Sequence, residues 1–231
     1  LRKSIPWFQI LIGAYQDAQV TGTCVSYQYW NYNAKKNIDK PCIDLRPLEN
    51  VRIDPGADWA DPINSSPYII DMIPMRVMDV RSRMNNPDPT TGQPRWNKHD
   101  DGVILAAQQS YSDTTRQTRE RNRTDSKDQS NKINEFAIVW VHRVIMEIDG
   151  EDMVYYTLGT HALLSKPVPI KQAYWHGKRP YVMGTCVIET HKIYPDGPVG
   201  ISKDVQAEIN EVTNQRIDNV KFAMNKRYFV K

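Results

Sequence analysis

The chain is poor in cysteine and has no long hydrophobic run. Its three cysteines, Cys24, Cys42 and Cys186, form no C-x-x-C pair. An odd number of cysteines at such wide spacing does not make a disulfide framework, so we expect free thiols, as in a reducing cytoplasm. No apolar stretch approaches the roughly 18–20 residues that a membrane-spanning helix needs. We therefore expect no membrane partner.

An excess of charge of one sign is also missing. The chain has 30 Lys+Arg and 27 Asp+Glu, a net charge of +3. This balance excludes a histone-like polycation that holds nucleic acid by bulk charge. Hydrophobic residues make up 40% of the chain, slightly below the usual share, whereas 10% aromatics is too many for a disordered chain. The composition predicts a folded chain whose thin apolar content is completed by a partner.

Motifs of the common enzyme classes are missing as well. The sequence contains no G-x-x-x-x-G-K-[ST], G-x-G-x-x-G, G-x-S-x-G or H-E-x-x-H pattern. Its five histidines lie far apart, without the spacing of metal ligands. We expect no catalytic residue, no cofactor and no metal, which favours a structural or binding role. An active site assembled from scattered residues stays open as an alternative.

That alternative depends on acidic residues. Asp54, Asp58 and Asp61 lie in a Pro/Gly-rich loop, but their spacing misses the alternate positions of a calcium-binding loop and favours capped turns. Asp54, Asp58, Asp100 and Asp101 would carry the chemistry of a metal-dependent nucleic-acid-processing enzyme. This enzyme is the second functional hypothesis.

Two further segments carry charge. Residues 108–132 are almost wholly polar with both signs interleaved, which favours a solvated loop or surface helix over a phosphate-binding strip. Residues 175–180 (WHGKRP) are basic and contain an aromatic side chain. They favour a surface loop anchored by a buried Trp175 over a phosphate contact.

The pattern of elements predicts an α+β fold. Ser4 and Pro6 signal a helix start, apolar residues then recur at helical spacing to Ala18, and Gly22 ends the pattern. Alternating residues predict strands over 23–32, 51–53, 68–73 and 181–194, with a hairpin loop over 33–40 and a short helix from Pro74 to Met84. One or two helical turns are expected over 103–107.

The strongest β-signal lies between Phe136 and Leu158, where Asp149-Gly150 separates two β-branched runs as in a hairpin. We thus expect an antiparallel, β-rich body with an N-terminal helix and a long C-terminal helix.

The C-terminal helix is predicted from Ser202, as its N-cap, to Lys231, a length of roughly 45 Å. Apolar residues at Val205, Ile209, Ile217, Val220 and Met224 form one stripe with Thr213. Acidic residues lie early in the helix and basic residues late, a distribution that complements the helix dipole. Such a helix should protrude from the body or pack against copies of itself.

Residues 197–202 (GPVGIS), 204–210 (DVQAEIN) and 214–219 (NQRIDN) resemble the segment that enters the stem in portal proteins of short-tailed (podovirus-type) bacteriophages. Residues 16–30, a helix followed by a Trp-bearing strand, are similar to the wing region of that family. So are residues 49–55 (ENVRIDP) with 68–70 and the helix after Pro74.

The resemblance implies a structural, non-ATPase subunit of a portal ring, usually of twelve copies, at one capsid vertex. Double-stranded DNA would enter and leave through this ring. Terminase, capsid and tail adaptor proteins would be partners, and assembly would take place in the host cytoplasm. Residues 1–200 would form a wing-like domain and 201–231 the first stem helix of a chain truncated at both ends. A different neck or tail protein of the virion is a further alternative.

The resemblance also suggests site residues. Lys221, Lys226, Arg227 and Lys231 are the candidates to face DNA or a neighbouring subunit. The competing interpretation is that these four residues only complement the helix dipole and stay solvated. The resemblance assigns no role to residues 108–132.

Overall fold

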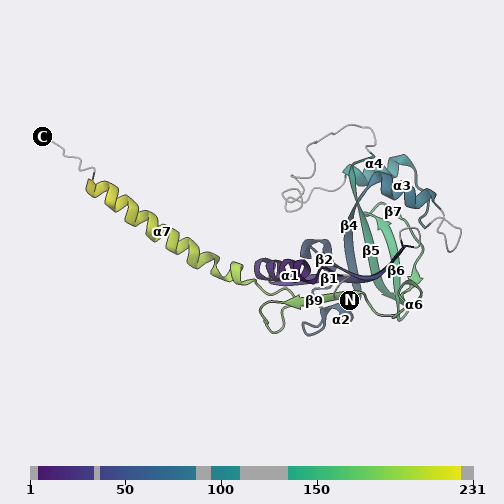
Figure 1. Cartoon of the computed structure of the whole chain (residues 1–231), viewed down its shortest axis with the longest axis horizontal. Coiled ribbons are helices and arrows are strands. Elements are labelled where there is room, and N and C mark those ends of the chain that lie inside the picture. Colours follow the sequence, from purple (N-terminus) through teal and green to yellow (C-terminus); the bar gives the residue numbers. More distant parts are fainter. Residues whose placement is uncertain (1–4, 34–36, 87–94, 110–134, 225–231) are drawn as a thin grey trace. The chain divides into compact units, whose positions relative to one another are not determined.

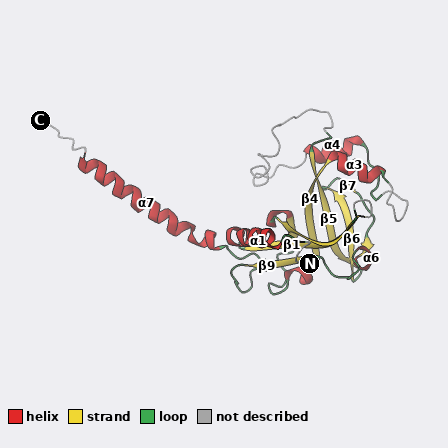
Figure 2. Cartoon of the chain, viewed as in Figure 1, coloured by secondary structure: helices red, strands yellow, loops and turns green. Residues whose placement is uncertain are grey.

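A computed structural model describes residues 5–33, 37–86, 95–109 and 135–224. The chain divides into two compact units, the first made of Leu1–Leu45 with Met183–Lys231 and the second of Arg46–Val182. Figures 1 and 2 show their helices and antiparallel strands. The α+β prediction, with an N-terminal and a long C-terminal helix, is confirmed.

The first unit combines two helices with a three-stranded sheet of order β2-β1-β9. Helix α1 (Trp7–Thr21) ends at Gly22, whose φ of 81° is the left-handed conformation of a helix C-cap. Its elements after α1 are β1 (Thr23–Asn33), β2 (Ile38–Arg46), β9 (Tyr181–Thr185) and α7 (Pro198–Met224). The ends of β2 and β9 reach into the second unit, because Arg46 and Tyr181 belong to it.

The second unit is built on a six-stranded sheet of order β3-β4-β5-β6-β7, with β8 paired to β6. Its strands are β3 (Val51–Ile53), β4 (Tyr68–Arg76), β5 (Ile138–Ile148), β6 (Glu151–Leu158), β7 (Ala162–Leu163) and β8 (Val168–Pro169). Its helices are η2 (Leu48–Asn50), α2 (Pro62–Ser65), α3 (Val77–Asn85), α4 (Asp101–Gln109) and α6 (Ile170–Ala173). The β5–β6 hairpin turns at Asp149 and Gly150, both with positive φ, as the sequence predicts.

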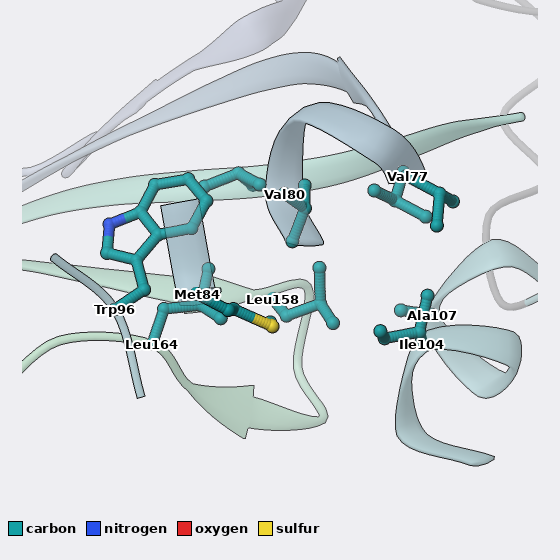
Figure 3. Close-up of a cluster of buried hydrophobic side chains, with 10 residues drawn as sticks. Val77, Val80, Met84, Trp96, Ile104, Ala107, Leu158 and Leu164 are labelled. Carbon is teal, nitrogen blue, oxygen red and sulfur yellow. The ribbon is translucent and has the colours of Figure 1, made fainter. Parts of the chain in front are cut away.

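The core of this unit lies where α3 and α4 pack against the sheet. Figure 3 shows side chains from the two helices meeting Leu158 of β6. Strand β5 is buried along most of its length, so both its faces are covered. The cluster comprises Val77, Val80, Met84, Trp96, Ile104, Ala107, Val139, Val141, Leu158 and Leu164. This arrangement gives the second unit a hydrophobic core of its own.

Some predicted boundaries are wrong. Strand β4 continues to Arg76, so Pro74 lies within a strand opposite Trp140 instead of opening the helix. Strand β3 pairs with Ile69–Asp71, so Pro74 lies beyond the part of β4 that β3 covers, where a proline is better tolerated.

The strand predicted over 181–194 stops at Thr185, because the chain turns back there and the Cys186 N–H donates to the carbonyl of Gly22. The loop predicted over 33–40 is shorter, since β1 continues to Asn33 and β2 begins at Ile38. Of the polar stretch 108–132, only the first two residues lie in the described part of the chain.

None of the described helices combines the length and apolar character required to cross a bilayer. The three cysteines are free thiols, as expected.

Replacing Leu158 by Ala should destabilise the second unit strongly. The Leu158 side chain is fully buried in the α3–α4 core, so its truncation leaves a cavity. We expect the free energy of unfolding to fall by about 2–5 kcal/mol. The matched control is Leu163→Ala, because the Leu163 side chain is 43% exposed and should cost about 1 kcal/mol or less. Denaturant unfolding of both variants checks the difference, and equal losses would contradict this account of the core.

Replacing Gly197 by Ala should disturb the junction between α1 and α7. A Cβ at Gly197 would lie 2.5 Å from the Gln19 carbonyl oxygen and 2.8 Å from the Gly22 nitrogen, so the backbone would have to move apart. The expected loss is about 1–3 kcal/mol of unfolding free energy. Gly200→Ala is the control, because a Cβ there meets nothing within 4 Å and should stabilise the helix slightly. Chemical denaturation of both variants tests this, and a harmless Gly197→Ala would show that the close approach is absent.

Candidate assembly surface

Helix α7 lies almost entirely in solvent. From Val199 to Met224 every residue is exposed, and none of the 27 residues of the helix is buried. The helix is about 40 Å long. Its contact with α1 involves its N-terminal end, where Gly197 approaches Gln19 and Gly22. The rest of α7 therefore receives little packing energy from the described part of the chain.

Most of the large apolar residues of α7 follow one side of the helix, whereas Phe222 lies on the opposite side. Val205, Ile209, Ile217 and Val220 are each about half exposed, and Met224 more so. With about 100° of rotation per residue, this stripe also includes Ile201, Val212 and Thr213. Three acidic residues occupy the opposite side, Asp204, Glu211 and Asp218, and Glu208 borders the stripe beside Ile201. An exposed apolar stripe of this length, interrupted by Arg216, marks an interaction surface.

Polar side chains of α7 bond to the helix itself. The Ser202 hydroxyl donates to the Pro198 carbonyl at 2.9 Å, and the Thr213 hydroxyl to the Ile209 carbonyl at 2.8 Å. The Gln206 amide donates to Asn210 Oδ1 at 3.0 Å. These polar side chains therefore have partners within the helix itself. The exposed apolar side chains of the stripe are not covered by the rest of α7.

The predicted start of this helix is wrong. The helix begins at Pro198, the residue type favoured at a first helical position, and Ser202 lies inside it instead of capping it. The first turn contains no acidic residue. Because the helix dipole acts within the first and last turns, Asp204, Glu208 and Glu211 do not stabilise its N-terminus as predicted.

Of the predicted site residues, only Lys221 lies in the described part of the chain. Its Nζ is 3.3 Å from Asp218 Oδ1, an ion pair three residues apart whose side chains are both exposed. Such a pair contributes little to stability, so the Lys221 ammonium is accessible to a partner. Lys226, Arg227 and Lys231 lie outside the described residues.

Helix α1 presents a second exposed apolar face. Phe8, Leu11, Ile12 and Tyr15 occupy helical spacing, and the Phe8 side chain is 77% exposed. Ala18 is the buried residue of this helix. The helical spacing of these residues predicts the helix itself but does not by itself predict a binding role. Helix α1 shows the same helical spacing of apolar residues as α7, and both helices belong to the first unit.

Three of the four acidic residues of the enzyme hypothesis, Asp54, Asp58 and Asp101, make local contacts within the chain. Asp54 Oδ1 accepts the Gly56 N–H, and Asp58 Oδ1 accepts the Ala60 N–H, both at 3.1 Å. Asp61 caps α2, which confirms the prediction of capped turns. Asp101 is ion-paired to Arg81 at 2.6 Å. Among the residues that the structure describes, no group of three or more His, Cys, Asp or Glu side chains is placed to hold a metal ion.

The loop of residues 175–180 is anchored differently from the prediction. Trp175 is 86% exposed, so it is not the buried anchor. Arg179 takes that role: its guanidinium donates to Asp152 at 2.7 and 2.9 Å and to the Ile63 carbonyl at 2.7 Å. An Arg satisfies a bidentate carboxylate and a carbonyl together, which an indole with one N–H cannot do.

Comparison with protein families supplies the identity. The model of the family described as "Phage SU10 portal protein" matches residues 8–231. A comparison with curated proteins found no match. The family match confirms the resemblance to short-tailed phage portals drawn from the stem-entry and wing segments. Because it covers nearly the whole chain, including α1 and α7, the chain belongs to the phage SU10 portal protein family and is a structural protein of the phage virion.

Proposed function

We propose that this chain is the repeating subunit of a twelve-membered portal ring at one capsid vertex. Double-stranded DNA passes through the ring during packaging and ejection, and terminase, capsid and tail adaptor proteins attach to it. The family supports the coarser part, a portal protein that forms an oligomeric ring with phage head and tail partners. The exposed apolar stripe of α7 is the observation that supports assembly from this chain's own residues.

The stripe favours packing of α7 against a neighbouring copy. An isolated helix in water is marginal, and helices in proteins gain most of their stability by burying an apolar face. In a ring, each subunit offers two different surfaces to its two neighbours. The apolar faces of α1 and α7 belong to one unit and supply apolar area for such contacts. We assign residues 201–231 to the first stem helix and residues 1–200 to the wing-like domain on this basis.

The low net charge of the chain suits a channel that binds DNA only weakly as the DNA passes through. A net charge of +3 gives little bulk attraction for DNA. Phosphate contacts position DNA without reading its sequence. We propose that Lys221, Lys226, Arg227 and Lys231 supply a limited set of such contacts near the end of the stem helix.

Replacing Ile209 by Glu should prevent ring assembly. The residue lies in the middle of the exposed stripe, and a charge buried there against a neighbour would lack a partner. Because Ile209 is exposed within its own chain, the subunit should keep its fold. The mass of the particle in solution should drop from ring to single subunit. Ala207→Glu is the control, because Ala207 is exposed on the side of the helix opposite to the stripe, and it should assemble normally. Rings formed by Ile209→Glu would contradict the proposed interface.

Reversing the late cations should impair DNA transport and leave the ring intact. We expect Lys221→Glu, Lys226→Glu and Arg227→Glu together to lower the yield of DNA-filled heads by roughly tenfold, because phosphate attraction becomes repulsion. Lys203→Glu is the control, since Lys203 lies on the same side of α7 as Lys221 but near the helix start. Electron microscopy of rings and measurement of packaged DNA separate the outcomes. Loss of the ring would show that these residues form a subunit interface instead.

A further inference from the structure

A buried ionic cluster lies in the second unit. Asp71 of β4 has a fully buried side chain, and its Oδ2 accepts a hydrogen bond of 2.9 Å from the Tyr181 hydroxyl. Arg46 Nε lies 3.6 Å from the same oxygen, and Arg143 Nη1 lies 3.8 Å from it. We call these four residues the Asp71 cluster. All of them belong to the unit Arg46–Val182.

The Asp71 carboxylate holds the cluster together. A buried charge is tolerated only where opposite charges and hydrogen bonds compensate it. Arg143 lies directly across from Asp71 in the β4–β5 ladder, and its Nη1 is also 3.4 Å from the Tyr181 hydroxyl. Burial raises the pKa of Tyr181 well above its usual value, so the hydroxyl keeps its proton near neutral pH and can donate to Asp71. Removing the negative charge would leave the two arginines near one another without compensation.

The positions of Arg46 and Tyr181 in the chain give the cluster its significance. The chain passes between the two units twice, between Leu45 and Arg46 and between Val182 and Met183. Arg46 is the last residue of β2, and Tyr181 is the first residue of β9. These are the two outer strands of the β2-β1-β9 sheet. Each passage between the units therefore lies next to a residue, Arg46 or Tyr181, whose side chain is close to Asp71 Oδ2.

We propose that Asp71 is a clamp that fixes both passages of the chain to strand β4. A polar cluster that only filled the core would have no reason to include the terminal residues of two strands far apart in the sequence. Arg143 supports the clamp from β5 as a second positive charge near the Asp71 carboxylate. The clamp is a conformational device within one subunit and does not depend on the ring or on DNA. Its loss should loosen the two passages before it unfolds the six-stranded sheet.

Hydrogen exchange of the whole chain, resolved by mass spectrometry of peptides, tests the clamp. In Asp71→Asn, amides of residues 43–48 and 180–186 should exchange about tenfold faster or more, the scale expected when a buried charged contact is lost. Amides of the β5–β6 hairpin should change by about twofold or less. Glu135→Gln is the control, because Glu135 is ion-paired to Arg81 in the same unit but away from both passages. It should leave residues 43–48 and 180–186 unchanged.

Three results would overturn the proposal: unchanged exchange at both passages in Asp71→Asn, faster exchange at one passage only, or an equal increase throughout the sheet. Should Asp71→Asn fail to fold, hydrogen exchange of the Tyr181→Phe variant tests the clamp instead. It removes only the hydroxyl that donates to Asp71 Oδ2. Faster exchange over residues 180–186, with an unchanged β5–β6 hairpin, supports the clamp. Unchanged exchange over residues 180–186 in that variant overturns it.

Discussion

The proposed assembly of this protein depends on one physical constraint, the apolar stripe that α7 exposes to water. A helix about 40 Å long gains little from propensity alone and needs a partner for its apolar side. Within the described chain, α7 has close packing only near its N-terminal end, at Gly197. Helix α1 adds a second exposed apolar face in the same unit. In the proposed ring, each copy covers the stripe of its neighbour, and membership in a portal family supplies the independent reason to expect a ring.

The second unit is self-sufficient by comparison. Helices α3 and α4 close a core over β5 and β6, and Leu158, Val139 and Val141 are fully buried there. Arg179 ties a surface loop to Asp152 and to the carbonyls near α2. This unit thus has a hydrophobic core made entirely of its own residues. The Asp71 cluster belongs to the same unit. It includes Arg46 and Tyr181, which lie at the two ends of that unit in the sequence.

Local patterns were predictable from the sequence, whereas features set by distant contacts were not. The stripe of α7, the Asp149-Gly150 turn and the left-handed Gly22 follow from spacing and turn chemistry, and all are present in the structure. The start of α7 was misplaced because Ser202 is a good cap, although Pro198 already suits a first helical position. The exposure of Trp175 could not be foreseen, since Arg179 replaces it as an anchor through residues far away in the sequence. Asp71 likewise finds Arg143 and Tyr181 only in the folded chain.

The number of subunits in the particle tests the central claim most directly. Native mass spectrometry of the whole protein, recorded over a range of concentrations, distinguishes a closed ring from other states. A portal ring predicts one dominant species of twelve copies that persists on dilution. A single subunit at every concentration, or an open-ended series of oligomers without a closed species, would contradict the claim that the α7 stripe is covered by a neighbouring copy.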